Sequence, residues 1–102
     1  LPSLILDEID SGVSGEIAGK ISKILLEISK EIQLIVITHL PQVAAKANYH
    51  YKVEKQDNLK KNTTIINKLN DNERIDELAK MLSGETISLA AIENAKALIS
   101  NH

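Results

Sequence analysis

The fold is decided by residues 1–39, which read LPSLILDEIDSGVSGEIAGKISKILLEISKEIQLIVITH. A short apolar run ends abruptly in two acids, Asp7 and Glu8, as a buried strand does where it leaves a sheet. A second apolar run at residues 33–38 is rich in β-branched side chains and predicts a strand that is buried on both faces. Because a helical pattern separates the two runs, the sequence predicts a βαβ unit with parallel strands and a right-handed crossover.

The helix of this unit is predicted to run from Ser14, whose side chain can cap the first turn, to about Lys30. One face of this helix is apolar and is predicted to face the core; it consists of Ile17, Ile21, Ile24 and Ile28. A short helix with Pro41 in its first turn is expected to follow the second strand and to run to Ala47.

The remaining sequence predicts a β-hairpin followed by two helices. The hairpin is expected to have a half-exposed strand at residues 49–54 with His50 exposed, a polar loop at 56–62 and a return strand at 63–69. The two helices are expected to form an antiparallel pair. The first spans residues 72–83 and stops at Gly84, and the second opens at Thr86 or Ser88 and runs to about Ser100. Their apolar stripes are predicted to be Ile75, Leu78, Ala79 and Leu82 in the first, and Leu89, Ile92, Ala95 and Ile99 in the second.

The composition is that of an ordinary small globular chain. Of its 102 residues 43% are hydrophobic and 25% are charged, and twelve basic and fourteen acidic residues give a net charge of -2. This balance argues against a strong nucleic-acid-binding face on the segment. The absence of cysteine excludes disulfides and thiolate metal sites. The longest apolar run, Leu34 to Ile37, is far too short to span a membrane.

The acidic pair is the first candidate for chemistry. Ligands of open α/β sheets bind outside the carboxyl ends of the strands, where Asp7 and Glu8 stand. Neighbouring strand residues point to opposite faces, so the two acids can take separate roles. Phosphoryl transfer needs such a division, with one acid near Mg²⁺ and one group that orients the attacking water. The alternative is a solvated acidic turn after a buried strand.

Two further candidates accompany the acids. His39 directly follows the second strand, and a parallel neighbour would place it beside the acids, within reach of a terminal phosphate. Taken alone, a histidine at a strand end is more often a structural or surface residue. The connecting loop consists of small residues that suit a close approach to a phosphate or a protein surface, or simply a turn with a helix cap: Ser11, Gly12, Val13, Ser14 and Gly15.

Together these elements resemble a known family. The stretch LILDEIDSGVSGEIAGKI followed by VITHLPQVAAKAN resembles the C-terminal ATPase head of RecN, a bacterial DNA repair protein related to the structural-maintenance-of-chromosomes (SMC) proteins. The later ERIDELAKMLSGETIS resembles the end of that head, so the resemblance covers nearly the whole chain. It implies an α/β fold, namely part of a P-loop NTPase head of the ABC type, with a parallel βαβ core, a β-hairpin and C-terminal helices.

The resemblance also implies roles. LILDE is similar to the Walker B motif, in which Asp7 would hold Mg²⁺ through its water shell and Glu8 would polarise the attacking water. The loop Ser11–Gly15 matches the D-loop, with Ser14 where many relatives carry aspartate. His39 matches the switch histidine that senses the γ-phosphate of ATP.

Several motifs of such a head are missing from residues 1–102, which contain no GxxxxGK[ST] phosphate loop, Q-loop or SGGE-type signature. Gln42 belongs to the resemblance but has no implied role. We therefore expect residues 1–102 to be the C-terminal lobe of the head, a fragment that alone does not hydrolyse ATP and binds it weakly or not at all. The parent is expected to bind two ATP between two identical heads, to act on DNA in double-strand-break repair and recombination, and to reside in the cytoplasm with the nucleoid.

Other interpretations fit parts of the sequence. An ABC transporter ATPase usually carries proline after the acidic pair, where this chain has Ile9. A DExH-type helicase would carry a Ser-Ala-Thr-like motif at the next strand, where Thr38 and His39 stand. A non-enzymatic interaction module with a vestigial site would be expected to have lost Glu8 or His39, and both remain. Open sheet edges and apolar faces also predict that the isolated chain self-associates.

Overall fold

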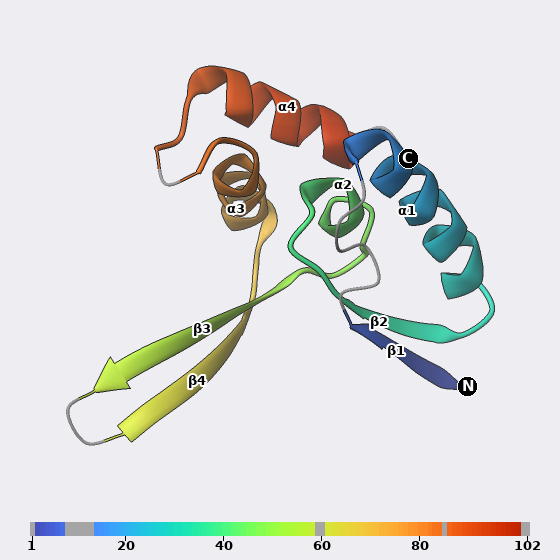
Figure 1. Cartoon of the computed structure of the whole chain (residues 1–102), viewed down its shortest axis with the longest axis horizontal. Coiled ribbons are helices and arrows are strands. Elements are labelled where there is room, and N and C mark those ends of the chain that lie inside the picture. The colour runs from blue at the N-terminus through green and yellow to red at the C-terminus, as the bar shows by residue number, and fades with distance from the viewer. Residues whose placement is uncertain (1, 8–13, 59–60, 85, 101–102) are drawn as a thin grey trace.

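The chain is a mixed α/β structure, as the sequence predicts. The computed structural model describes residues 2–7, 14–58, 61–84 and 86–100, with the side chains of 57, 58, 61 and 62 left out of that description. The elements in chain order are β1 (Ser3–Asp7), α1 (Gly15–Ser29), β2 (Gln33–Ile37), α2 (Pro41–Ala44), β3 (Tyr51–Asn58), β4 (Lys61–Lys68), α3 (Asp71–Ser83) and α4 (Leu89–Ser100). Figure 1 shows α1 beside the β1–β2 pair, the β3–β4 hairpin extending from the opposite side, and α2 between these parts.

The βαβ unit forms as predicted. β1 and β2 pair in parallel, from Ser3 opposite Gln33 to Asp7 opposite Ile37. A side-chain hydrogen bond of 2.9 Å, from Ser3 Oγ to Gln33 Oε1, fastens the amino ends of the two strands. Their carboxyl ends therefore finish side by side, at one edge of the sheet.

The core-facing side of α1 differs from the prediction. The helix buries Ala18, Ser22 and Leu25. Of the predicted stripe, Ile21 packs against this core, whereas Ile17, Ile24 and Ile28 are exposed. Each buried residue comes one position after a residue of the predicted stripe, which on a helix is a rotation of about 100°. The helix therefore has two neighbouring stripes without charge, and periodicity does not say which one meets the sheet. The side with the smaller residues packs inward, and the buried Ser22 hydroxyl is satisfied because it donates to the carbonyl of Gly19.

The strands are also less buried than predicted. One sheet face packs on α1 through Leu6, Leu34 and Val36. The opposite face is open, with Ile5 64% and Ile37 50% exposed. The prediction of burial on both faces is wrong for this chain, because only one of the two faces is covered by an element of the described residues.

The hairpin is longer and oriented differently from the prediction. β3 and β4 pair antiparallel from Tyr51 opposite Lys68 to Asn58 opposite Lys61, so strand pairing occupies most of the predicted loop. Tyr51 and Val53 are exposed, while Lys52 and His50 are half-buried, which contradicts the predicted exposure of His50.

Two ion pairs of Lys52 accompany this orientation of the hairpin. Lys52 Nζ lies 2.9 Å from a carboxylate oxygen of Glu54 and 2.9 Å from one of Glu77 on α3. Hydrogen bonds to both carboxylates raise the pKa of Lys52. The polar side of the strand therefore turns towards α3, where its charged groups find partners.

The C-terminal helices build a second core together with α2. Its buried members are Ala44, Ala45, Leu78, Ala79, Ala91 and Ala95. α3 starts with the reciprocal capping box of Asn70 and Glu73 and ends at Gly84, whose φ of 82° favours glycine. In Figure 1 α3 is seen almost end-on while α4 runs across the view, so the two helices cross instead of forming the predicted antiparallel pair.

No helix in the described part of the chain is long and apolar enough to cross a membrane.

The stripe of α4 is confirmed at three of its four predicted positions, since Ala95 is buried and Ile92 and Ile99 pack against the same core. Leu89 departs from the prediction because it is 83% exposed, and Ala91 is buried in addition. The helix begins at Leu89, after Ser88, whose hydroxyl accepts a hydrogen bond of 3.0 Å from the backbone N–H of Ala91. The first residue of the helix therefore lies outside the contact with α3.

Two leucines allow a matched test of this second core. Leu78 is fully buried and Leu89 is 83% exposed. We expect Leu78→Ala to lower the free energy of unfolding by about 2–5 kcal/mol, because it leaves a cavity in the core, and Leu89→Ala to change it by less than about 0.5 kcal/mol. Urea denaturation followed by circular dichroism measures both. Equal losses in the two variants would contradict the described packing.

Candidate functional site

The candidate site lies at the carboxyl edge of the parallel strands. Asp7 is the last residue of β1 and stands opposite Ile37, the last residue of β2. His39 follows two residues later, and both Asp7 and His39 are exposed. The structure thus brings the first acid and the histidine to the same end of the sheet, as the sequence predicts. The second acid, Glu8, lies outside the described residues.

The connection that carries His39 is short and internally bonded. Thr38 Oγ1 accepts a hydrogen bond of 3.0 Å from the backbone N–H of Leu40. The carbonyl of Leu40 then accepts from the backbone N–H groups of Val43 and Ala44, at 3.2 and 3.1 Å. α2 therefore begins directly after the histidine, and His39 is held between a strand end and a helix start.

α2 is shorter than predicted, since it ends at Ala44 instead of Ala47. It is fixed from two sides. Val43 packs into the α1 core, and Arg74 of α3 donates hydrogen bonds to the carbonyls of Ala44, at 3.1 Å, and Ala45, at 2.9 Å. These bonds satisfy carbonyls that a helix end leaves without partners.

The predicted loop Ser11–Gly15 is described only at its end. Ser14 caps α1, as predicted, because its hydroxyl accepts the backbone N–H of Ile17 at 3.4 Å. Ser11, Gly12 and Val13 lie outside the described residues. Gly15, the first residue of α1, lies beside the side chain of Gln42, since a Cβ placed on Gly15 would stand 3.1 Å from Gln42 Nε2.

Gln42 is the residue of this region for which the sequence offered no role. It is half-buried, and its Oε1 atom is buried without a hydrogen-bond partner among the described residues. A sequence signal was present, since a glutamine stands between Pro41 and Val43 in an otherwise apolar short helix. Only the structure shows that Gln42 lies beside Gly15 of α1.

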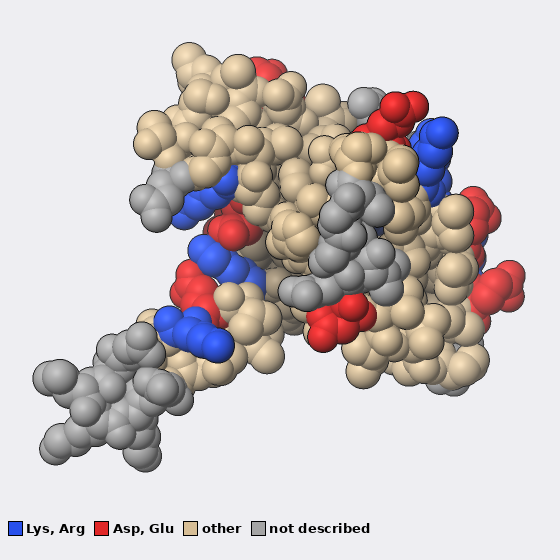
Figure 2. Space-filling model, viewed as in Figure 1, with Lys and Arg blue, Asp and Glu red and all other residues tan. Residues whose placement is uncertain are grey.

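The surface charge agrees with the composition. Figure 2 shows acidic and basic side chains interspersed on the face in view, without a continuous basic area. The described residues contain no cluster of three or more histidines or carboxylates that would bind a metal by itself.

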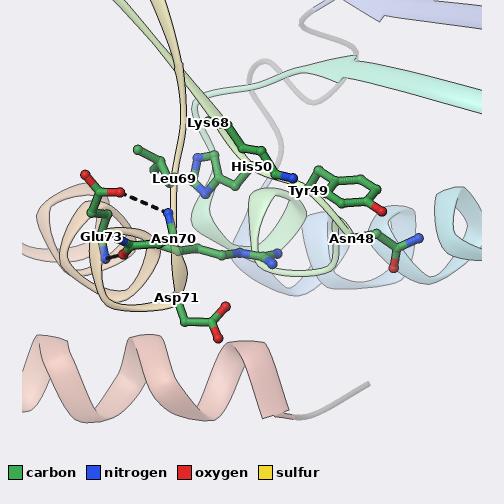
Figure 3. A pocket seen from close by; sticks show the side chains of 9 residues that line it. Asn48, Tyr49, His50, Lys68, Leu69, Asn70, Asp71 and Glu73 are labelled. Atoms are coloured by element: carbon green, nitrogen blue, oxygen red, sulfur yellow. Dashed lines mark hydrogen bonds between the residues drawn. The ribbon is translucent and has the colours of Figure 1, made fainter.

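A cavity of about 610 Å³ lies elsewhere, between the base of the hairpin and the start of α3 (Figure 3). It contains none of the candidate residues; its lining consists of Asn48, Tyr49, His50, Lys68, Leu69, Asn70, Asp71, Glu73 and Arg74. The helix start in this cavity is already occupied by the mutual hydrogen bonds of Asn70 and Glu73, at 3.0 and 2.8 Å.

His50 in this cavity is electrostatically perturbed. Burial lowers its pKa from the ordinary 6.5, the positive charge of Arg74 lowers it further, and Glu77 acts in the opposite direction. Burial also lowers the pKa of Arg74. His50 is therefore disposed to stay neutral in the folded chain, where its Nδ1 is buried without a hydrogen-bond partner among the described residues.

Comparison with solved structures defines the class of the fold. A structure described as "Structural biochemistry of ATP-driven dimerization and DNA stimulated activation of SMC ATPases" superimposes with a TM-score of 0.70 at 22% sequence identity. The match covers 84% of this chain and 51% of the other. The chain therefore has the fold of part of an SMC-type ATPase.

Sequence comparison gives the particular relatives. The chain is 49% identical over 98 residues to the DNA repair protein RecN of Rickettsia conorii, and 41% identical over 99 residues to that of Deinococcus radiodurans. These matches cover 96% and 97% of the chain but 18% and 17% of the relatives, so it spans less than a fifth of their length. No protein-family model matches. Over nearly its whole length the chain is a RecN-type sequence, and the resemblance predicted from the sequence is confirmed.

The low pKa of His50 predicts a pH dependence of stability. The unfolded chain binds a proton at His50 more readily than the folded chain does. The contribution of His50 to the free energy of unfolding is therefore fully present above pH 6.5 and declines as the pH falls below that value. Thermal unfolding between pH 7.5 and 5.5 should show this decline, and His50→Gln should reduce it. A wild-type slope in His50→Gln would contradict the assignment.

Proposed function

We propose that residues 1–102 are the C-terminal lobe of an ABC-type ATPase head, and that this lobe supplies the Walker B, D-loop and switch-histidine part of an ATP site. The observation that carries the proposal is the parallel register of β1 and β2, which sets Asp7 opposite Ile37 and brings His39 to the same edge. Open α/β sheets bind their ligands at this edge. The SMC-type fold and the RecN-type sequence support the same function.

Each candidate residue has a distinct role in this proposal. Asp7 holds Mg²⁺, largely through water, which suits a cation that keeps several waters and takes few protein oxygens. The metal, when bound, neutralises charge on the phosphates. Glu8 accepts a hydrogen bond from the attacking water and orients it, and His39 donates one to the terminal phosphate. Phosphoryl transfer depends on the positions of the groups around the phosphate. This lobe therefore contributes by holding Asp7 and His39 at the ends of two paired strands.

The open apolar surface supports the assignment as one lobe of a larger head. Ile5 and Ile37 on the sheet, and Ile17 and Ile24 on α1, remain exposed. Burying such side chains in a larger structure would stabilise it by about 25 cal/mol per Å² of apolar surface. The match covers 18% of the relative from Rickettsia conorii, which leaves ample chain in such a parent to cover these faces.

In the parent, two copies of the head would bind two ATP between them, with the loop Ser11–Gly15 facing the second head. The structural neighbour is described as an SMC ATPase with ATP-driven dimerization and DNA-stimulated activation, and the sequence relatives are named DNA repair proteins. We propose by analogy a homodimeric, ATP-driven engagement of heads that acts on DNA in double-strand-break repair and recombination, in the cytoplasm with the nucleoid.

The direct test is ATP turnover by the full-length parent with Glu8→Gln. The amide keeps the shape of the carboxylate but is a poor proton acceptor, so we expect hydrolysis to fall by at least about 100-fold while ATP binding survives. The matched control is Glu16→Gln, an exposed acid in the first turn of α1, which should retain wild-type turnover. Unchanged turnover in Glu8→Gln would overturn the proposal.

The isolated chain gives a second test. It lacks a glycine-rich phosphate loop, whose backbone N–H groups provide most contacts to ATP phosphates. We expect no ATP turnover by the 102-residue chain, and no ATP binding tighter than the millimolar range in calorimetry, while the parent binds and hydrolyses ATP under the same conditions. Turnover by the isolated chain would show that residues 1–102 contain a complete site and would refute the proposed division of the head.

A further inference from the structure

The guanidinium of Arg74 joins α3 to the end of α2. Its Nη2 donates hydrogen bonds to the carbonyls of Ala44, at 3.1 Å, and Ala45, at 2.9 Å, and a further bond to the carbonyl of Ala47. These carbonyls lie at and just beyond the last residue of α2, where a helix leaves its oxygens without intrahelical partners. Because a guanidinium presents several N–H donors in one plane, a single side chain of α3 holds the carboxyl end of α2.

Hydrogen bonds continue from this end of α2 to the residues on either side of His39. The backbone N–H of Ala44, whose carbonyl accepts from Arg74, donates to the carbonyl of Leu40 at 3.1 Å. The N–H of Leu40 in turn donates to Thr38 Oγ1 at 3.0 Å. This last bond spans His39, since Thr38 and Leu40 are its two neighbours in the chain. Successive hydrogen bonds therefore link Arg74 to the backbone that carries the histidine.

α2 needs support of this kind because it is short. It has four residues, and its N-cap residue, Leu40, makes no side-chain hydrogen bond to the first turn. Pro41, Val43 and Ala44 are buried, but apolar burial is non-directional and does not by itself determine the orientation of one helical turn. Hydrogen bonds depend on angle as well as distance. The bonds from Arg74 therefore restrict the rotation of α2 on its core.

We propose that Arg74 is a positioning residue for His39, an inference that rests on the proposed function and extends it to a side chain outside the nucleotide site. Acting through α2, Arg74 holds the backbone of His39 so that the imidazole meets the terminal phosphate in the alignment that hydrolysis needs. Loss of the Arg74 donors then lowers kcat and leaves ATP affinity unchanged, because the main phosphate contacts belong to a glycine-rich loop outside residues 1–102.

Variants of Arg74 in the full-length parent test this role. Arg74→Met keeps the aliphatic stem and removes the donors, so we expect kcat to fall about tenfold, with ATP affinity and the binding of one ATP per chain unchanged. Arg74→Lys keeps a charged donor and should lose no more than about threefold. Lys80→Met is the matched control, because it removes an exposed positive charge from the last turn of the same helix, and it should have wild-type kcat.

A double-mutant cycle with His39→Ala distinguishes positioning of the histidine from general stabilisation of the fold. If Arg74 acts through His39, Arg74→Met should cause no further loss of kcat in the His39→Ala background. Arg74→Gln, which keeps a shorter neutral donor, takes the place of Arg74→Met in the cycle if the methionine variant does not fold.

Several results would overturn the inference. They are an equal loss of kcat with and without His39, weaker ATP binding or wild-type kcat in Arg74→Met, no recovery in Arg74→Lys, and an equal loss in Lys80→Met. If Glu8→Gln abolishes turnover while Arg74→Met behaves like Lys80→Met, the proposed function stands and the positioning role is refuted. If Glu8→Gln leaves turnover intact, both fall.

Discussion

The parallel pairing of β1 with β2 is the constraint on which the rest of the structure depends. Parallel strands require a crossover, and α1 provides it by lying on the sheet face that carries Leu6, Leu34 and Val36. The same pairing ends both strands at one edge, so Asp7, the last residue of β1, and His39, two residues after β2, lie at the same end of the sheet. The strand pairing therefore determines that Asp7 and His39 share this edge.

α2 transmits this constraint to the second half of the chain. Its buried residues belong to both cores, since Val43 packs against α1 while Ala44 packs against α3 and α4. Arg74 holds the end of α2 by donating to its carbonyls. A helix of four residues has almost no stability of its own, so these tertiary contacts maintain it. The position of His39 thus depends on the packing of α2 against α1, α3 and α4.

Local signals were predictable from the sequence, and partner-dependent ones were not. The Ser14 cap and the stop at Gly84 depend on neighbouring residues, and the βαβ unit depends on the order of strand, helix and strand; the structure has all three where the sequence predicts. The buried face of α1 and the orientation of His50 depend on which element packs against them. Two apolar sides of a helix, or two sides of a strand, have the same periodicity, so the choice between them is made by tertiary contacts.

The candidate site divides in the same way. The edge position of Asp7 and His39 followed from strand order, whereas their roles came from the family resemblance. The position of Gln42 beside Gly15 could not be predicted, because it involves two helices whose relative position depends on the buried face of α1. The open isoleucines show the same dependence on a larger scale, since the sequence predicted burial that the described residues do not provide.

The central claim is that the ends of β1 and β2 form one wall of an ATP site. The most direct measurement is a crystal structure of the full-length head with Mg²⁺ and a non-hydrolysable ATP analogue. The account predicts Asp7 in the water shell of the metal and His39 within about 3 Å of a terminal phosphate oxygen. A bound nucleotide that leaves both side chains in solvent, with the phosphates away from this edge, would contradict it.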